Sequence, residues 1–397
     1  DRGHRINCAQ RSGLTPLHLA CSNMHSLCVE LLIREGALLT LVNSQGRLPL
    51  HSAVLSQKLE IVKLLCESAA FDPQQFVQRD NFQWTPFALA CGRGASEIVT
   101  YILTFSGVID PLIHACNRLG SSPLHIAASM GQAANVQALV QARAPLEMID
   151  LQGFIPLFSA IYHGNLETVQ LLIDAGSDVH HVSEHAMTAM HVCASRGHFH
   201  LVDYLASHGV EINRENSDGI TPLMQSVLLD ATEGHVTMIH ALHQAGAAVD
   251  QQNARKQSAM QKACSLGKLT AMHCLLECGA SLQLIGPHGW TLLHASVHHN
   301  HPAMFSLLKD NHFEISSIDD QGSTALHLAC SDGLLSWVKQ LIEAKIDLHH
   351  FNAQGLQAWH LAILGDQLEI VQYLVQMGAD VQSKASGGMT ALHMAAS

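Results

Sequence analysis

The hexapeptide TPLHLA, from Thr15 to Ala20, recurs in varied form along the 397 residues of the chain. Successive copies start 33 residues apart eight times and 37 residues apart three times. A fixed period of about 20 to 50 residues indicates a stack of similar supersecondary units, so this repeat decides the fold. The twelve copies start at Thr15, Leu48, Thr85, Ser122, Ile155, Thr188, Thr221, Ser258, Thr291, Thr324, Gln357 and Thr390.

Each copy carries the sequence signals of two short helices. The Thr or Ser that opens most copies can accept from an unpaired N–H of the first helical turn, and a following Pro has no N–H to leave unpaired. A glycine such as Gly197 then interrupts the apolar pattern, and a second apolar segment ends at a glycine such as Gly176, which suits a left-handed C-cap. One such pair cannot bury its apolar face alone, so we expect neighbouring pairs to stack.

The period of 33 residues and the hexapeptide T-P-L-H-x-A resemble the ankyrin repeat, and the resemblance covers the whole chain. It implies an all-α solenoid of helix-turn-helix pairs with projecting, β-hairpin-like loops, forming a single array over residues 1–397. A glycine two residues before the Thr slot is expected to close a projecting turn. It is present in nine copies, as Gly13, Gly46, Gly120, Gly153, Gly219, Gly289, Gly322, Gly355 and Gly388.

The three intervals of 37 residues each require an insertion of four residues. We expect the insertions near 68–80 and 107–117 to lengthen projecting loops, and the insertion within 228–234 to separate the two helices of one repeat. Residues 3–7 match the tail of a preceding repeat, and the chain stops inside the first helix of the twelfth copy. We therefore expect a segment of a longer protein, or an array whose last repeat is truncated.

Composition argues against several classes of partner. The chain has 21 basic and 33 acidic residues, and no Lys/Arg run that could follow a phosphate backbone, so nucleic acid is not an expected partner. No apolar run approaches the 18 or so residues that a membrane span needs. The eleven cysteines include no C-x-x-C pair, and only Cys274 and Cys278 come near as C-x-x-x-C. Reduced thiols in an intracellular, cytoplasmic setting are the simplest interpretation, or in a host cytosol for a bacterial effector.

Most of the question raised by 29 histidines is answered by the repeat. The fourth hexapeptide position is His in eight copies, and the resemblance implies that this imidazole bonds the neighbouring loop: His18, His51, His125, His191, His294, His327, His360 and His393. A second family position follows the inter-helix turn and takes His25, His198, His235 and His301. Twelve histidines are thereby assigned to architecture.

His298 and His299 are outside those positions. Adjacent helical residues point about 100° apart and cannot easily share one ion, so we interpret the pair as surface or contact residues; adventitious metal binding remains the alternative. No metal or cofactor is expected. Catalytic templates are also absent, with neither G-x-S-x-G nor H-E-x-x-H in the sequence. Five cysteines in Ala positions of the first helix are expected to be buried and inert: Cys21, Cys91, Cys193, Cys264 and Cys330.

The resemblance implies that a partner docks on the concave face formed by the projecting loops and first helices. Aromatic and Arg side chains are frequent carriers of binding energy. The main candidates, from copies three to five, are Phe82, Trp84, Arg93, Arg118, Leu119, Met130, Phe154, Tyr162 and His163, and a second group consists of Trp290, His298 and His299. The alternative for Trp84 is that its long loop folds the indole back onto the array. Trp359 and Trp337 are expected in the core.

The sequence therefore predicts a non-catalytic, monomeric scaffold that binds one or more proteins or peptides. The alternative is a targeting or regulatory segment of a larger enzyme, channel or secreted bacterial effector. A zinc-dependent enzyme that uses the surplus histidines is a third interpretation, which a metal assay after dialysis would test.

Overall fold

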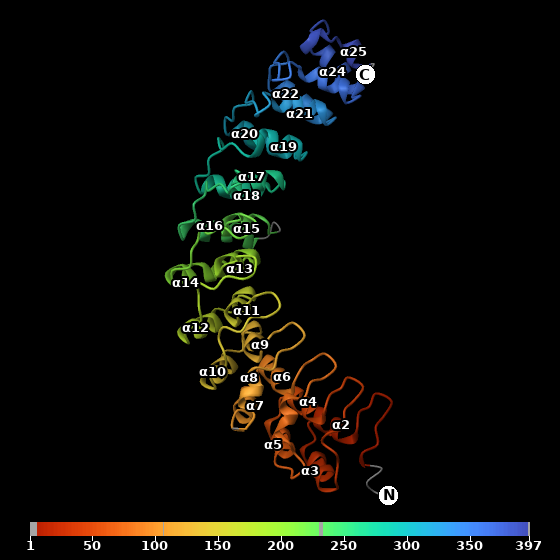
Figure 1. Ribbon diagram of the computed structural model, residues 1–397, viewed down its shortest axis with the longest axis vertical. Coiled ribbons are helices and arrows are strands. Elements are labelled where there is room, and N and C mark those ends of the chain that lie inside the picture. The colour runs from red at the N-terminus through yellow and green to blue at the C-terminus, as the bar shows by residue number, and fades with distance from the viewer. Residues whose placement is uncertain (1–5, 106, 230–232, 396–397) are drawn as a thin grey trace. The chain divides into compact units, whose positions relative to one another are not determined.

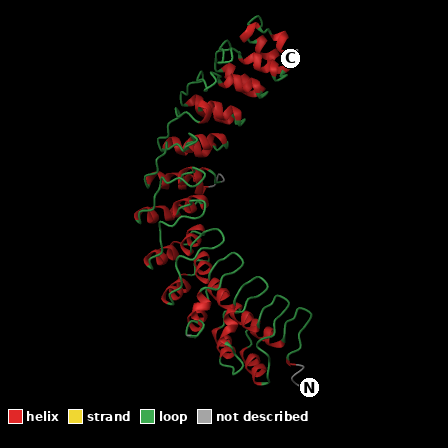
Figure 2. Cartoon of the chain, viewed as in Figure 1, coloured by secondary structure: helices red, strands yellow, loops and turns green. Residues whose placement is uncertain are grey.

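A computed structural model describes residues 6–105, 107–229 and 233–395. Contacts between residues divide the chain into two compact units, residues 1–211 (unit 1) and 212–397 (unit 2). Each unit is a stack of helix pairs. Within the described residues the structure consists of helices and loops, with one isolated β-bridge between Ile318 and Thr324 (Figure 2). The all-α class and the helix-pair architecture are as predicted.

The first helices of unit 1 begin directly after the hexapeptide's opening residue. Thr15 accepts a hydrogen bond from the backbone N–H of His18, and Thr85 does so from Ala88, so each side chain satisfies one unpaired donor of its helix. These helices are α2 (Pro16–Ser22), α4 (Pro49–Leu55), α6 (Pro86–Arg93), α9 (Pro123–Ser129), α11 (Pro156–Tyr162) and α13 (Ala189–Arg196).

The second helices of unit 1 form an outer row, and the loops project from the row of first helices on the other side (Figure 1). The second helices are α3 (Ser26–Arg34), α5 (Leu59–Cys66), α7 (Ser96–Ile102), α10 (Ala133–Gln141), α12 (Leu166–Asp174) and α14 (Val202–Ser207), the last preceded by the 3-10 turn η2 (Phe199–Leu201). One equivalent position of this row is fully buried in every copy: Val29, Val62, Val99, Val136, Val169 and Val202. Burying a valine stabilises the fold by roughly 1.5–3 kcal/mol, so the shared seam is a main source of stability.

Unit 2 repeats the same arrangement. Its first helices are α15 (Pro222–Val227), α17 (Ala259–Ser265), α19 (Leu292–His298), α21 (Ala325–Ser331), α23 (Ala358–Leu364) and α25 (Ala391–Ala395). Its second helices are α16 (Glu233–Gln244), α18 (Leu269–Glu277), α20 (Ala303–Asp310), α22 (Leu335–Glu343) and α24 (Leu368–Gln376), and two loops contain the 3-10 turns η3 (Pro287–Gly289) and η4 (Ser386–Gly388). Trp337 and Trp359 are buried, as predicted.

The projecting loops close with a left-handed residue, as the glycine pattern predicts. Gly46 has φ of 72° and Gly153 has φ of 73°. Three copies place a side chain in this strained conformation instead: Gln83, Ala186 and Lys256, with φ between 53° and 65°. Successive loops also bond to one another, as where the N–H of Leu151 donates to the carbonyl oxygen of Leu119 at 3.0 Å.

The first two insertions differ from the expectation that they lengthen projecting loops. They form the 3-10 turn η1 (Pro73–Val77) and the short helix α8 (Ile109–Ile113), which place Phe76 and Leu112 in the interior. The ring of Phe76 packs against Phe71 and Phe105, with centroids 5.2 and 5.4 Å apart. Apolar side chains pull both insertions inward, because exposing them would forfeit burial energy. The third insertion lies partly outside the described residues.

None of the described helices is both long enough and apolar enough to cross a membrane.

Candidate functional site

Two acidic side chains shape the loops that carry Trp84 and Phe154. In copy three, Oδ1 of Asp80 accepts hydrogen bonds from the N–H groups of Phe82 and Trp84, each at 2.9 Å. In copy five, Oδ1 of Asp150 accepts from the N–H of Phe154 at 3.0 Å. Such turns replace backbone pairing with a local side-chain acceptor, and they fix where the following aromatic residue emerges.

Hexapeptide histidines of the preceding first helices form hydrogen bonds to the same two loops. Nε2 of His125 donates to the carbonyl oxygen of Phe154 at 2.9 Å, and Nε2 of His51 donates to that of Trp84 at 3.3 Å. Because a carbonyl can only accept, each imidazole carries its proton on Nε2 and leaves Nδ1 as an acceptor. The Nδ1 of His125 accepts from the backbone N–H of Ser122 at 3.2 Å. The predicted bridge between a first helix and the neighbouring loop is thus present.

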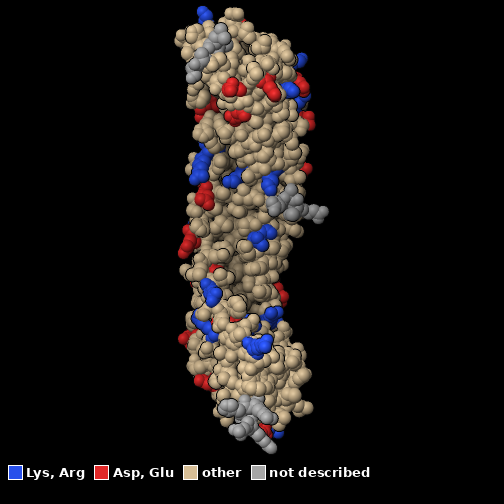
Figure 3. Space-filling view, turned by 90° about the vertical axis from the view of Figure 1, so that its right-hand side faces the viewer, with Lys and Arg blue, Asp and Glu red and all other residues tan. Residues whose placement is uncertain are grey.

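The loops and first helices of copies three to five enclose a hollow of about 310 Å³, which we call the aromatic hollow. Six of the predicted contact residues line it: Trp84, Leu119, Met130, Phe154, Tyr162 and His163. Leu119 is 65% exposed and Met130 is 58% exposed, whereas the three aromatic residues are half-buried. In Figure 1 the loops of unit 1 point to the right, and Figure 3 views the protein from that side. Most of the surface seen there consists of residues other than Lys, Arg, Asp and Glu.

Ring contacts hold Phe154 and Tyr162, which we call the aromatic wall of the hollow, in place. Phe154 packs against Phe158 and Tyr162, with centroids 5.6 and 6.4 Å apart. The guanidinium of Arg196 lies 4.4 Å from the centroid of the Tyr162 ring, a cation–π geometry that contributes about 0.5–1 kcal/mol at an exposed site. The wall is therefore preorganised, which lowers the entropy that a partner must overcome on binding.

Three predicted contact residues lie outside the aromatic hollow. Phe82 is 51% exposed on its loop, and Arg93 is exposed at the end of α6. Arg118 donates from Nη2 to the carbonyl oxygen of Asn81 at 2.8 Å, so it braces two neighbouring loops. The indole of Trp84 is half-buried and also lines the hollow, so it has features of both interpretations given above.

The second predicted group lines a separate hollow of about 270 Å³ in unit 2. The ring of His298 lies 4.6 Å from that of Trp290 and 5.1 Å from that of His299, measured between centroids. Nδ1 of His298 lies 3.8 Å from Oδ2 of Asp332. His301 instead bonds backward to the carbonyl oxygen of Ser265 at 3.0 Å, as an architectural histidine. The structure thus places Trp290, His298 and His299 in one hollow, where the ring of His298 contacts the other two.

Comparison with known proteins decides the family. The pattern of the family described as ankyrin repeats (3 copies) matches residues 2–77, 71–150, 102–183, 157–233, 228–319 and 299–385. The chain belongs to the ankyrin repeat family. Ankyrin repeats mediate protein–protein interactions and are generally not catalytic.

Individual relatives of this ankyrin array are 25% to 30% identical to it over the residues that align. The probable 26S proteasome regulatory subunit p28 of Saccharomyces cerevisiae is 30% identical over 188 residues, 46% of this chain and 80% of that protein. The transient receptor potential cation channel subfamily A member 1 of Homo sapiens is 25% identical over 383 residues, 85% of this chain and 34% of that protein. The B-cell lymphoma 3 protein homolog of Mus musculus is 28% identical over 53% of this chain.

Among solved structures, the ankyrin repeat domain of Bcl-3 aligns with a TM-score of 0.48 and 27% identity, over 58% of this chain and 99% of that one. The ankyrin array spans only part of several relatives: 21% of the Drosophila melanogaster channel subunit of the same name, 14% of its Caenorhabditis elegans homolog and 48% of the mouse B-cell lymphoma 3 homolog.

The chemistry of the ankyrin array's cysteines is that of buried thiols. Burial raises the pKa of Cys21, Cys193 and Cys264 to about 12, and it also raises the pKa values of Cys91 and Cys330. A thiol held protonated at neutral pH is a poor nucleophile. All five are buried, as predicted for these positions.

One residue that contacts the aromatic side chains of the hollow was not predicted from the sequence. Arg196 occupies the eighth position after Thr188, a variable position equivalent to those used to choose the candidates in copies three to five. The first group of candidates came from copies three to five, whereas Arg196 belongs to copy six and contacts the ring of Tyr162 in copy five. Extending the same rule by one copy would have found the residue.

Proposed function

We propose that the chain is a non-catalytic protein-binding array and that the aromatic hollow receives a partner. The observation that carries the proposal is that six of the contact residues predicted from copies three to five line one hollow. The chain is 397 residues long and its recognition surface is built from loops and first helices, so the remaining loops can extend the contact beyond the hollow.

The lining selects the chemistry of the partner. Most of the surface that lines the hollow is apolar, and three serines, two histidines and the side chains of Asn117, Asp150 and Gln152 supply polar groups. The volume suits one or two large side chains, and burying such an anchor in a desolvated pocket is the usual origin of a binding hot spot. We propose a protein or peptide that presents a large apolar side chain, flanked by neutral or basic residues because this chain has a net charge of −12.

A second candidate is favoured by one alignment. The match to the human cation channel subunit covers 85% of this chain but 34% of the channel subunit. This supports the possibility that the array is the targeting or regulatory segment of a larger protein. Both candidates use the same surface for binding.

We also propose that the array is monomeric, continuous through both units and located in the cytoplasm. Seven buried free cysteines support a reducing compartment. The twelve copies at regular spacing support continuity.

Site-specific photo-crosslinking in cells tests the proposal. A photoreactive amino acid replaces Leu119 or Met130 at the hollow, or Leu27 or Leu31 on α3, where exposures of 81% and 60% give matched controls on a second helix. We expect a crosslinked protein from the two hollow positions and not from α3. Crosslinks from α3 alone would place recognition on the other face.

A further inference from the structure

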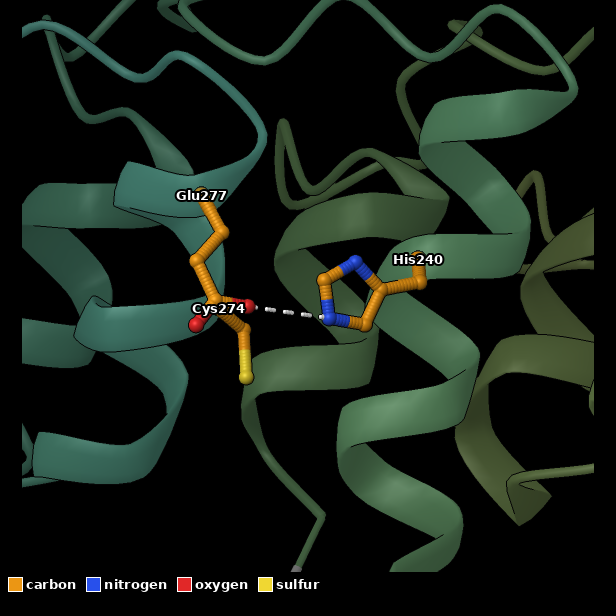
Figure 4. Close-up of side chains that lie close together, drawn as sticks. All are labelled: His240, Cys274 and Glu277. Carbon is orange, nitrogen blue, oxygen red and sulfur yellow. Dashed lines mark ion pairs between the residues drawn. The ribbon is translucent and has the colours of Figure 1, made fainter.

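A group of side chains that can bind a metal lies between the second helices of two neighbouring repeats in unit 2. His240 belongs to α16, and Cys274 and Glu277 belong to α18 (Figure 4). One potential ligand atom from each residue lies within 4.8 Å of the others. Among the described residues, this is the one set of three His, Cys, Asp or Glu side chains that meets that condition.

The side chains point toward one another. Nε2 of His240 lies 3.4 Å from Oε2 of Glu277, and Figure 4 shows the sulfur of Cys274 on the same side of the imidazole. Tetrahedral zinc with bonds of about 2.0–2.3 Å holds its ligand atoms about 3.3–3.8 Å apart, so small rotamer changes would complete the geometry. The spacing within α18 is favourable because residues three apart share a helix face.

The opposite edge of the imidazole already has a partner. Nδ1 of His240 lies 3.5 Å from Sγ of Cys278, the residue that follows α18. If Nε2 binds a metal, Nδ1 carries the proton and can donate it to this sulfur. Outer partners of this kind fix the tautomer and ring orientation of metal-binding histidines.

We propose that His240, Cys274 and Glu277 form a zinc site, with water as the fourth ligand and Cys278 orienting His240. Thiolate, imidazole and carboxylate are the ligand types that zinc uses in proteins. One thiolate and one carboxylate neutralise the charge of Zn²⁺. Binding releases one proton, from the Cys274 thiol, as the zinc–sulfur bond forms.

The site would join two repeats. α16 and α18 pack against each other, and each contributes a fully buried apolar residue, Ile239 and Met272. The zinc would link the two helices at the solvent edge. Glu277 is highly exposed and His240 is partly exposed, so an ion can enter from solvent. The consequence is a local clip that stabilises unit 2 when zinc is bound.

Cobalt(II) is the probe because its absorption reports both thiolate ligation and tetrahedral geometry. The whole chain is used, with Cys8, Cys28, Cys66 and Cys116, the cysteines that are not buried, replaced by serine to remove other accessible thiols. Histidines elsewhere can bind cobalt, but they cannot produce a thiolate-to-cobalt charge-transfer band.

We expect one equivalent of cobalt to produce that band, and one equivalent of zinc to abolish it and raise the melting temperature. Cys274→Ser and His240→Ala should lose both effects. Cys278→Ser should keep the band with about 10–100-fold weaker affinity, as for other outer partners. Absence of the band in the parent, or its persistence in Cys274→Ser with unchanged affinity, would overturn the proposal.

Discussion

His125 donates a hydrogen bond from Nε2 to the carbonyl oxygen of Phe154, a residue of the aromatic hollow, across 2.9 Å. A histidine that recurs in the repeat therefore positions a proposed contact residue in the next repeat. In the same way, Nε2 of His51 donates to the carbonyl oxygen of Trp84, another residue that lines the hollow. Single imidazoles thus connect the helical frame to the proposed recognition surface.

Removing the imidazole should destabilise unit 1. His125→Ala leaves the Ser122 N–H and the Phe154 carbonyl without this partner, which costs about 1–3 kcal/mol for each buried group that stays unsatisfied. His125→Gln should cost less, because Gln261 fills the same position in copy eight and accepts from the N–H of Ser258 at 2.8 Å. Chemical unfolding of the two variants checks the order. Equal losses would show that hydrogen bonding is not the reason.

Stability should fall as pH decreases from about 6.5 toward 4. Burial lowers the pKa of His51 and of His327 to about 4, from the ordinary histidine value of 6.5. Below pH 6.5 the unfolded chain takes up protons that the folded chain resists, so the free energy of unfolding decreases by about 1.4 kcal/mol per pH unit for each such histidine. Above pH 6.5 this contribution is complete. Urea unfolding at several pH values measures the slope.

His327→Gln is the control for that slope. It should remove the contribution of about one proton from the pH dependence while leaving that of His51. An unchanged slope would mean that other groups dominate the acid response.

A glycine at the strained loop position of copy eight should stabilise the array. Lys256 has φ of 57°, and a left-handed conformation costs a residue with a side chain roughly 1–2 kcal/mol. After the greater chain entropy of glycine is subtracted, Lys256→Gly should gain about 0.5–1 kcal/mol. Lys256→Ala keeps the strain and removes the charge, so it should gain nothing. Thermal melting separates the two.

The first insertion should act as part of the core. Phe76 is fully buried between Phe71 and Phe105, so Phe76→Ala should reduce the free energy of unfolding by about 3–5 kcal/mol. A loss below about 1 kcal/mol in chemical unfolding would support the projecting-loop interpretation instead.

Periodicity made the fold and the architectural histidines predictable. The opening Thr, the Pro and the glycines have local roles, so their positions specify helix ends without knowledge of tertiary contacts. The partners of His18 and His294, at Arg47 and Ser323, also follow from the repeat, because both lie 29 residues ahead. A regular stack converts sequence spacing into spatial contact.

The structure of the insertions that interrupt the 33-residue period could not be predicted in the same way. The insertion around Phe76 folds inward because three rings from two copies meet, and their register is not encoded by the repeat. The proposed zinc ligands were also not among the residues predicted from the sequence, which carried no expectation of a metal. Cys274 and Cys278 were visible as C-x-x-x-C, but His240 lies in the preceding repeat, after the insertion that shifts the sequence register by four residues.

The central claim is that the aromatic hollow binds the partner, and a matched pair of charge substitutions tests it most directly. Met130→Asp places a carboxylate at the hollow, and Leu27→Asp places one on α3 at comparable or greater exposure. The partner is the protein that the photo-crosslinking experiment identifies. Its affinity for each variant is measured by calorimetry, after the variants have been shown to melt at the same temperature. The account predicts a loss of at least about 30-fold for Met130→Asp, corresponding to a hot spot of about 2 kcal/mol, and no change for Leu27→Asp. Unchanged affinity for Met130→Asp, or an equal loss for both variants, would contradict it.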